Sequence, residues 1–374
     1  MKIAIHNAQF SYHLGGTERA MYTQLKNLLQ IDKEIDITLL TSKTSKESIF
    51  FKEIKELQSE KFRIKLFDIS DIDIKTKEGA NSSDKWHLEA VQFGLKTANF
   101  YKENNFDFII THFSTDLMFI PKDHKTVLNI HGTPSVSSPI DENCFEKANY
   151  LIFTTKDTRN KIHQMYPNTI NKKGKVIYLG TKILFNTFPV LERENDILFV
   201  GRLIKIKGVE ILISAIKRLS FPNKIKACIV GVGPEEDNLK GLVKKYGLEK
   251  NIQFISYLSD KELSLLYLNS KIAVFPSYKK EGILLSMLEA AAHGCGLIVS
   301  NCCGMPEFIE DNKNGLLFEP KNIKDLSNKI NLLMNNKDKR NEFGYNAFIK
   351  IKDYWNDLER TKELYKYYLE VKNE

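Results

Sequence analysis

The chain has 374 residues, of which 42% are hydrophobic and 27% charged, so it is long and apolar enough for two domains with a core each. Its formal net charge of +8 comes from lysines interleaved with acidic residues. This pattern lacks the dense basic arm of nucleic-acid-binding proteins, so we expect no nucleic-acid partner and at most a weak attraction to an anionic membrane surface.

Three further features bear on the compartment. The five cysteines are odd in number and irregularly spaced, which favours reduced thiols in the cytosol. The opening residues MKIAIHNAQF are typical of a first strand rather than a signal peptide. The most apolar window, 283–299, contains Glu289 and His293, which a membrane-spanning helix would not readily hold. We expect a cytoplasmic protein with at most peripheral contact with the inner membrane face.

The first half of the chain alternates short apolar runs with segments of helical periodicity. After the first run, residues 16–30 repeat Met21 and several leucines at three- and four-residue spacing, which predicts a helix. The polar segment 42–85 shows no clear pattern. The runs that predict strands lie at 2–8, 36–41, 106–113, 126–132, 150–155 and 175–180.

The second half repeats this alternation at tighter intervals. Strands that alternate with helices are typical of parallel sheets, so the sequence predicts an α/β fold. The predicted strands lie at 196–201, 226–231, 251–256, 271–276, 296–300 and 315–320.

The join between two domains is predicted in the polar stretch 183–195. The tail 354–374 predicts a long helix with an aromatic stripe that needs a surface to bury against, and we expect it to cross back to the first domain. The predicted domains are therefore 1–184, completed by this helix, and 193–352. The stripe consists of Tyr354, Trp355, Tyr365 and Tyr368.

Glu281 and Glu289 flank an apolar run in the second domain. On one helix they would lie about 12 Å apart, too far for the paired carboxylates of a glycosidase. If Glu281 instead lies in the turn before a helix that begins near Leu284, the free N–H groups of that helix favour phosphate, and Gly282 lets the backbone approach a ligand. The spacing then suits an extended ligand with hydroxyls at both ends and phosphates between them, as in a nucleoside diphosphate sugar.

Two cations lie where they can neutralise such a diphosphate. Arg202 directly follows a predicted strand, and Lys207 begins the next helix. On position alone, Lys205 competes with Lys207.

Glycines and a histidine follow other strands. The element GVGPEE, with Gly231 and Gly233, lacks the third glycine of a dinucleotide site. In the first domain, Gly16 and its neighbour let a loop approach a phosphate or acceptor. His131 lies at the carboxyl end of a strand, where sites gather in α/β folds, whereas His112 is interpreted as structural.

Several segments resemble one enzyme family. EGILLSMLE is similar to the E-x7-E motif of the retaining GT-B glycosyltransferases of glycosyltransferase family 4, and FVGRLIKIKGVEILISAI, IVGVGPEEDNLKGLV and NCCGMPEFIEDNKNGLLFEP resemble the segments around it. In the first half, GGTERA and NIHGTP match. The resemblance implies two Rossmann-like parallel-sheet domains facing a central cleft, with the acceptor held by the first domain and the donor by the second.

The resemblance also implies residue roles. Glu281 would bind hydroxyls of the donor sugar, Arg202 and Lys207 would neutralise the leaving diphosphate, and His131 would lie beside the anomeric region. Glu289 would bind the ribose hydroxyls. The remaining donor-binding residues would be Gly16, Gly231, Gly233, Tyr257, Leu258, Gly282, Ile283, Leu284 and Leu285, with Tyr257 and Leu258 near the base.

The implied activity is retaining transfer of a hexose-type sugar to a saccharide or lipid-linked saccharide in surface glycan synthesis. The expected donor is a UDP-sugar, with GDP-mannose next, and same-face attack is favoured over double displacement. No cofactor or metal is expected, because the D-x-D of Asp71 and Asp73 lacks a matching context. A sugar-nucleotide epimerase, another enzyme on this fold such as a phosphorylase, and a non-catalytic sugar-nucleotide binder are the alternatives.

Overall fold

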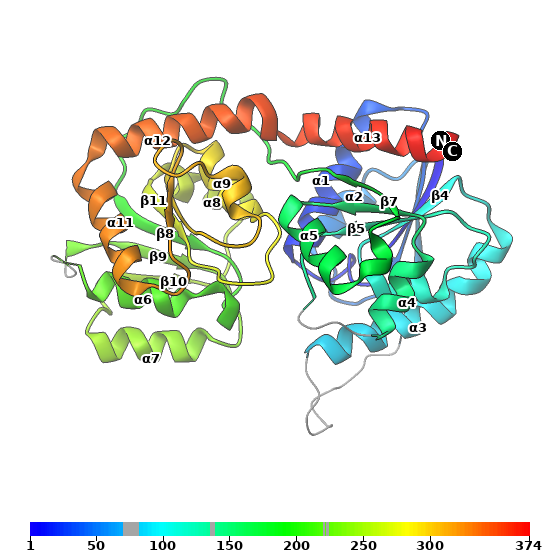
Figure 1. Ribbon diagram of the computed structural model, residues 1–374, viewed down its shortest axis with the longest axis horizontal. Coiled ribbons are helices and arrows are strands. Elements are labelled where there is room, and N and C mark those ends of the chain that lie inside the picture. Colours follow the sequence, from blue (N-terminus) through cyan, green and yellow to red (C-terminus); the bar gives the residue numbers. More distant parts are fainter. Residues whose placement is uncertain (70–81, 135–138, 220, 222–223) are drawn as a thin grey trace. The chain divides into compact units, whose positions relative to one another are not determined.

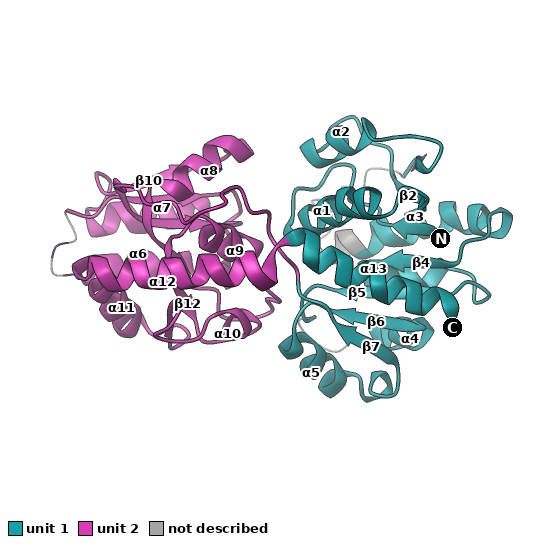
Figure 2. Ribbon diagram, turned by 90° about the horizontal axis from the view of Figure 1, so that it is seen from above, with its two compact units in different colours: residues 1–178, 357–374 teal, residues 179–356 magenta. Residues whose placement is uncertain are grey.

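The computed structural model describes residues 1–69, 82–134, 139–219, 221 and 224–374. It divides into two compact units, each built around its own parallel sheet (Figure 2). Unit 1 comprises Met1–Tyr178 and Asp357–Glu374, and unit 2 comprises Leu179–Asn356. The two parallel-sheet α/β units confirm the predicted fold class.

Unit 1 contains a seven-stranded parallel sheet in the order β3-β2-β1-β4-β5-β6-β7. Strands β4, β5 and β7 of this sheet are labelled in Figure 1. The first strand is central, and the chain extends the sheet first on one side of it and then on the other. The strands are β1 (Lys2–His6), β2 (Asp36–Ser42), β3 (Phe62–Phe67), β4 (Phe108–Thr111), β5 (Thr126–Ile130), β6 (Tyr150–Phe153) and β7 (Lys173–Val176).

Both faces of this sheet are covered by helices, so its central strands are apolar on both sides. Ile3 and Ile5 pack on one face with α1 and α13, whereas Ala4 packs on the other face with α3 and α4. The helices of the unit are α1 (Gly16–Ile31), α2 (Ile49–Lys55), α3 (Ser82–Glu103), α4 (Pro139–Lys147), α5 (Lys156–Met165) and α13 (Asp357–Asn373), with short 3-10 turns η2 (Ser114–Phe119) and η3 (Pro167–Thr169).

The C-terminal helix α13 packs beside α1 in unit 1, as the sequence predicts (Figure 2). The Tyr365 hydroxyl donates to Asp32 Oδ2 at 2.7 Å, and Tyr368 is buried in the unit 1 core. The predicted aromatic stripe is wrong at its start, because α13 begins only at Asp357. Tyr354 is exposed, and Trp355 packs edge-on against Phe308 within unit 2.

Unit 2 contains a six-stranded parallel sheet in the order β10-β9-β8-β11-β12-β13. Its strands are β8 (Asn195–Val200), β9 (Ala227–Val230), β10 (Ile252–Ile255), β11 (Ser270–Phe275), β12 (Gly296–Ser300) and β13 (Leu316–Phe318). Its helical segments are η4 (Lys205–Lys207), α6 (Val209–Lys217), α7 (Glu236–Tyr246), α8 (Asp260–Leu268), α9 (Leu285–Ala292), α10 (Met305–Phe308), α11 (Ile323–Asn335), α12 (Lys337–Lys350) and the π-helical η6 (Ile351–Trp355).

The strand order of the unit 2 sheet determines where a ligand can bind. Strand β8 lies between β9 and β11, so the loop after β8 runs to one side and the loop after β11 to the other. In parallel sheets such a reversal of strand order leaves a crevice outside the carboxyl ends of the strands. The loops that carry Arg202, Lys207 and Glu281 follow these two strands.

One arginine joins the loops at the opposite end of this sheet. The Arg193 guanidinium donates to the carbonyls of Ser270 and His293, each at 2.8 Å, and to those of Tyr267 and Gly294, each at 3.1 Å. These four carbonyls belong to the ends of α8 and α9 and the start of β11. The contacts fix the two helices relative to the sheet.

Within the described part of the chain, no helix is both long enough and apolar enough to cross a membrane.

Candidate functional site

The carboxyl edge of the unit 2 sheet brings together two of the predicted charged residues. Lys207 Nζ lies 2.8 Å from Glu281 Oε1, and each side chain is only 14% exposed. The same oxygen has no aligned hydrogen-bond donor among the described residues, so the contact is an ion pair that leaves acceptor capacity on the carboxylate. Two opposite charges are therefore held in a mostly buried place where a ligand with both hydroxyls and phosphates could engage them.

Backbone contacts hold the two loops close enough for this pair to form. The Tyr278 N–H of the β11 loop donates to the Ile206 carbonyl of the β8 loop at 3.1 Å. Gly208 has a φ of +68°, and a Cβ there would lie 2.3 Å from the Pro276 carbonyl oxygen. A residue with a side chain would push the loops apart, so Gly208 is what permits their approach.

Of the two candidate lysines, Lys207 is the one that contacts Glu281. Lys205 is exposed, whereas Lys207 turns toward the carboxylate. Arg202, directly after β8, is exposed and makes no ion pair with any residue in the described ranges. Its role with a diphosphate stays a prediction.

Helix α9 begins at Leu285, one residue later than the sequence predicts. No side chain of the described residues caps it, and Gly282, Ile283 and Leu284 that lead into it are buried. The first N–H groups of a helix without a side-chain cap are available to an anion. Glu281 precedes these groups.

Glu289 lies further along α9, where its Oε2 accepts a hydrogen bond from the Tyr267 hydroxyl at 3.1 Å. Tyr267 is on α8 and is almost fully buried. Sequence reasoning missed this tyrosine, because nothing in the spacing of residues 22 positions apart shows that they meet.

The two glycines of the β9 loop have a packing role. A Cβ on Gly231, whose φ is +143°, would lie 1.9 Å from the Gly201 carbonyl oxygen, and one on Gly233 would lie 2.3 Å from that of Leu203. The Leu203 N–H also donates to the Val232 carbonyl at 2.8 Å. These contacts explain both glycines without a ligand, and their part in a nucleotide pocket stays a prediction.

The predicted base-binding residues follow β10. Tyr257 is 61% exposed and Leu258 is half-buried. Directly after them, Ser259 and Glu262 form a capping box that starts α8. The loop is therefore anchored where it enters the helix, while the Tyr257 ring remains accessible.

In unit 1, His131 follows β5 and contacts a second histidine. His131 Nε2 lies 2.8 Å from His112 Nδ1, and the rings stack at 5.1 Å. Burial lowers the pKa of His131 to about 4, opposed by the nearby Glu18 carboxylate, and burial and His131 lower that of His112 well below its usual value. Both rings are therefore neutral at pH 7, and the N–H of one donates a hydrogen bond to the ring nitrogen of the other.

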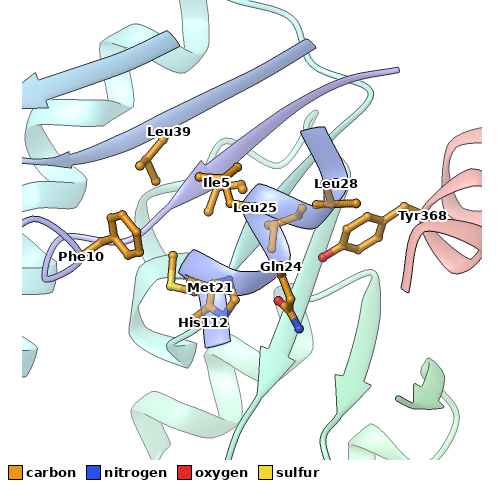
Figure 3. Close-up of a pocket in the computed structure, with 10 residues that line it drawn as sticks. Ile5, Phe10, Met21, Gln24, Leu25, Leu28, Leu39, His112 and Tyr368 are labelled. Carbon is orange, nitrogen blue, oxygen red and sulfur yellow. The ribbon is translucent and has the colours of Figure 1, made fainter. Parts of the chain in front are cut away.

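The sequence interpretation of His112 as structural did not include a contact with His131. The available signal was position, since both histidines follow neighbouring strands at the same sheet edge. His112 also lines a cavity of about 10 Å³, enough for about one water, together with Gln24 of α1 and Tyr368 of α13 (Figure 3).

The start of α1 has a buried carboxylate nearby. Glu18 is 1% exposed, and its Oε2 accepts from the Gly15 N–H at 3.0 Å and lies 2.8 Å from His13 Nδ1. Burial alone would raise the pKa of Glu18, but the hydrogen bond and charge of His13 and the backbone bonds outweigh it and lower that pKa. A Cβ on Gly16 would meet nothing within 4 Å, so there is open space beside this residue, and its contact with a ligand stays a prediction.

The D-x-D of Asp71 and Asp73 lies outside the described residues. Elsewhere in the described chain, no three metal-ligating side chains cluster. The predicted independence from metal remains to be tested.

Comparison with known proteins identifies unit 2 most clearly. Residues 182–350 match the family of glycosyl transferases group 1. An uncharacterised glycosyltransferase of Haemophilus influenzae is 34% identical over 183 residues, or 48% of this chain and 47% of that protein. The N,N'-diacetylbacillosaminyl-diphospho-undecaprenol α-1,3-N-acetylgalactosaminyltransferase of Campylobacter jejuni is 34% identical over 191 residues, or 50% of this chain and 49% of that protein. The chain thus spans about half the length of these two relatives.

A third relative matches from end to end. The uncharacterised glycosyltransferase MJ1069 of Methanocaldococcus jannaschii is 27% identical over 406 residues, covering 100% of this chain and 99% of that protein.

Solved structures show the same two-domain fold. Sucrose-phosphate synthase of Thermosynechococcus elongatus has a TM-score of 0.79 at 17% identity over 99% of each chain. HepE of Anabaena in complex with UDP-glucose has a TM-score of 0.77 at 18% identity, over 99% of this chain and 100% of that one. The fold is thus the GT-B fold of glycosyltransferases. Residues 182–350 match the glycosyl transferases group 1 family, which confirms the predicted resemblance to group 1 glycosyltransferases.

Proposed function

We propose that this protein is a retaining glycosyltransferase that moves a hexose-type sugar from a nucleoside diphosphate sugar to a saccharide or lipid-linked saccharide, without a metal ion. The observation that carries the proposal is the ion pair of Lys207 and Glu281 at the strand reversal of the unit 2 sheet. The pair lies within the residues that match a family of glycosyl transferases, and we assign its cation to the phosphates and its carboxylate to the sugar hydroxyls.

In this mechanism the bound donor contacts both members of the Lys207 and Glu281 ion pair. The ammonium of Lys207 gains the diphosphate as a second anionic partner, and the Glu281 carboxylate accepts hydrogen bonds from sugar hydroxyls. Arg202 supplies a further positive charge from the exposed end of β8. These cations stabilise the negative charge that develops on the leaving diphosphate, which is where preorganised charge lowers a barrier most.

The bond from the anomeric carbon to the diphosphate oxygen breaks as the bond to the acceptor oxygen forms on the same face. The acceptor hydroxyl passes its proton to the departing phosphate oxygen. Glu281 is already committed to Lys207 and to the sugar hydroxyls, so it is not the nucleophile that a double displacement would require. We therefore favour same-face attack.

A UDP-sugar is our first choice of donor, and GDP-mannose the second. Support for uridine comes from HepE, a protein of the same fold whose structure holds UDP-glucose. The relative from Campylobacter jejuni acts on a diphospho-undecaprenol acceptor, which supports a lipid-linked saccharide and a role in surface glycan synthesis. Such an acceptor would bring the protein to the cytoplasmic membrane face.

The experiment begins with a thermal-shift screen against nucleoside diphosphate sugars, because a ligand bound only by the native state raises the melting temperature. The stabilising donor is then incubated with saccharide and lipid-linked acceptors, and the anomeric proton signals of the product are recorded. A new glycosidic linkage of the donor's configuration, formed equally in the presence of a chelator, supports the proposal. Binding of the nucleotide without any turnover would favour a non-catalytic binder, and a product with only an inverted ring carbon would favour an epimerase.

A further inference from the structure

Helices α8 and α9 are joined by a set of polar contacts that the sequence did not reveal. From α8, the Tyr267 hydroxyl donates to Glu289 Oε2 at 3.1 Å and lies 3.2 Å from the Ser286 carbonyl. One turn earlier on the same helix, Ser264 Oγ lies 2.7 Å from Nε2 of His293, the residue that ends α9. We call these residues the α8–α9 bracket.

The hydrogen-bond roles within the bracket follow from the chemistry of the partners. His293 Nδ1 lies 2.7 Å from the Glu289 carbonyl oxygen, which can only accept, so Nδ1 carries the proton. Burial lowers the pKa of His293, opposed by this carbonyl contact and assisted by Arg193, so the ring is neutral. Its Nε2 must then accept from the Ser264 hydroxyl. His293 thus holds the backbone of Glu289 while Tyr267 holds its carboxylate.

Tyr267 is itself fixed on three sides. Its side chain is 1% exposed, and its ring stacks on His293 at 5.2 Å with an angle of 28° between the planes. Its carbonyl oxygen accepts from Arg193 at 3.1 Å and from the Cys295 thiol at 3.2 Å. A buried ring with a fixed backbone cannot swing away, so its hydroxyl defines one orientation of the Glu289 carboxylate.

We infer that Tyr267 is a positioning residue that orients the Glu289 carboxylate toward the vicinal diol of a ribose in a nucleoside diphosphate. This inference rests on the proposed function, which supplies the nucleotide. Two adjacent hydroxyls can both donate to one carboxylate only when its plane is correctly turned, and an unrestrained glutamate samples many rotamers. A carboxylate carries about four acceptor sites, so accepting the Tyr267 hydroxyl is compatible with binding a diol.

Tyr267→Phe tests this role, because it removes the hydroxyl and keeps the buried ring. Calorimetric titrations of the full chain would use uridine diphosphate, guanosine diphosphate and the 2',3'-dideoxy form of each. For the base that the wild type prefers, we expect the variant to lose about tenfold in affinity for the ribose form and less than twofold for the dideoxy form. In steady state, the KM for the donor should rise about tenfold while kcat changes less than twofold.

Two further variants separate positioning from a general loss of structure. In a Glu289→Gln background, adding Tyr267→Phe should cause less than a twofold further change in affinity for the ribose form. Tyr345→Phe is the matched control, because Tyr345 is 48% exposed, packs edge-on against Phe188 in the same unit and lies outside the bracket. It should bind all nucleotides as the wild type does.

The outcomes are distinguishable. Equal losses for the ribose and dideoxy forms, or an undiminished effect of Tyr267→Phe in the Glu289→Gln background, would overturn the positioning role and leave the proposed function standing. A wild type that binds none of the four nucleotides would instead overturn the proposed function, and the inference with it.

Discussion

Replacing Gly231 by alanine should destabilise unit 2 strongly, because this glycine lets the β9 loop lie against the β8 loop. Its φ of +143° is a conformation that residues with a side chain rarely adopt. The added Cβ would lie 1.9 Å from the Gly201 carbonyl oxygen, which belongs to backbone at the end of β8 and cannot rotate away as a side chain would. The loop that carries Arg202 and Lys207 would have to move.

The magnitude follows from two costs. A strained backbone conformation costs about 1–3 kcal/mol and overpacking about 1–3 kcal/mol, so we expect a loss of about 4 kcal/mol. For a unit of this size, 1 kcal/mol corresponds to about 2–4 °C, so the unit 2 transition should fall by about 8–16 °C in differential scanning calorimetry.

Gly241→Ala is the matched control, because Gly241 lies inside α7 and a Cβ there would meet nothing within 4 Å. Alanine is the better helix former, so this change should raise stability by about 0.5–1 kcal/mol. The reasoning would be refuted if Gly231→Ala melted like the wild type, or if Gly241→Ala lost as much stability as Gly231→Ala.

Three other predictions concern the site and its neighbours. Glu281→Gln should lower the rate of transfer about 100-fold in steady-state kinetics, while the melting temperature measured by calorimetry stays within a few degrees of the wild type. Near-normal turnover would count against the assignment of Glu281 to the donor site. Excess chelator should leave the transfer rate unchanged, and a loss restored by a divalent cation would show that the expected metal independence is wrong. Stability of unit 1 should fall as pH drops below 6.5, because His131 and His112 have folded pKa values below those of the unfolded chain, so unfolding takes up protons. With the pKa of His131 at about 4, its share of the lost unfolding free energy is about 2 kcal/mol at pH 5. Unfolding titrations of His131→Gln should therefore show a shallower pH dependence of stability than those of the wild type. An equally steep pH dependence would contradict the role of His131 in the acid destabilisation.

The sequence predicted those features of the fold that come from local patterns. Apolar runs bounded by polar residues located twelve of the strands, since a parallel sheet covered on both faces leaves a continuous apolar signal. Strand β3 was missed within the polar segment 42–85, because it lies at the sheet edge and alternates Phe62, Ile64 and Leu66 with charged residues. An alternating strand of this kind gives a weaker signal than a buried one.

The site was predictable in its composition more than in its contacts. Position alone could not separate Lys207 from Lys205, whereas the loop geometry that Gly208 permits turns Lys207 toward Glu281 and leaves Lys205 exposed. The histidine pair of His112 and His131 depends on two strands being neighbours, and the contact of Tyr267 with Glu289 depends on how two helices pack. Both are tertiary facts that no local spacing encodes.

The aromatic tail shows the same limit. An aromatic stripe correctly indicated that the last helix needs an apolar surface, and α13 finds it on unit 1. Periodicity could not show where the stripe begins, because Trp355 packs in unit 2 and Tyr354 is exposed and packs in neither core.

The most direct test of the account is the affinity of the chain for the nucleoside diphosphate of its donor, measured by calorimetry in Lys207→Ala and Lys205→Ala. The account predicts a loss of about 10- to 100-fold for Lys207→Ala, the loss of one hydrogen bond to a charged partner, and less than a threefold change for Lys205→Ala. Equal losses in the two variants, or undiminished affinity in Lys207→Ala, would contradict the claim that the Lys207 and Glu281 pair marks the donor site.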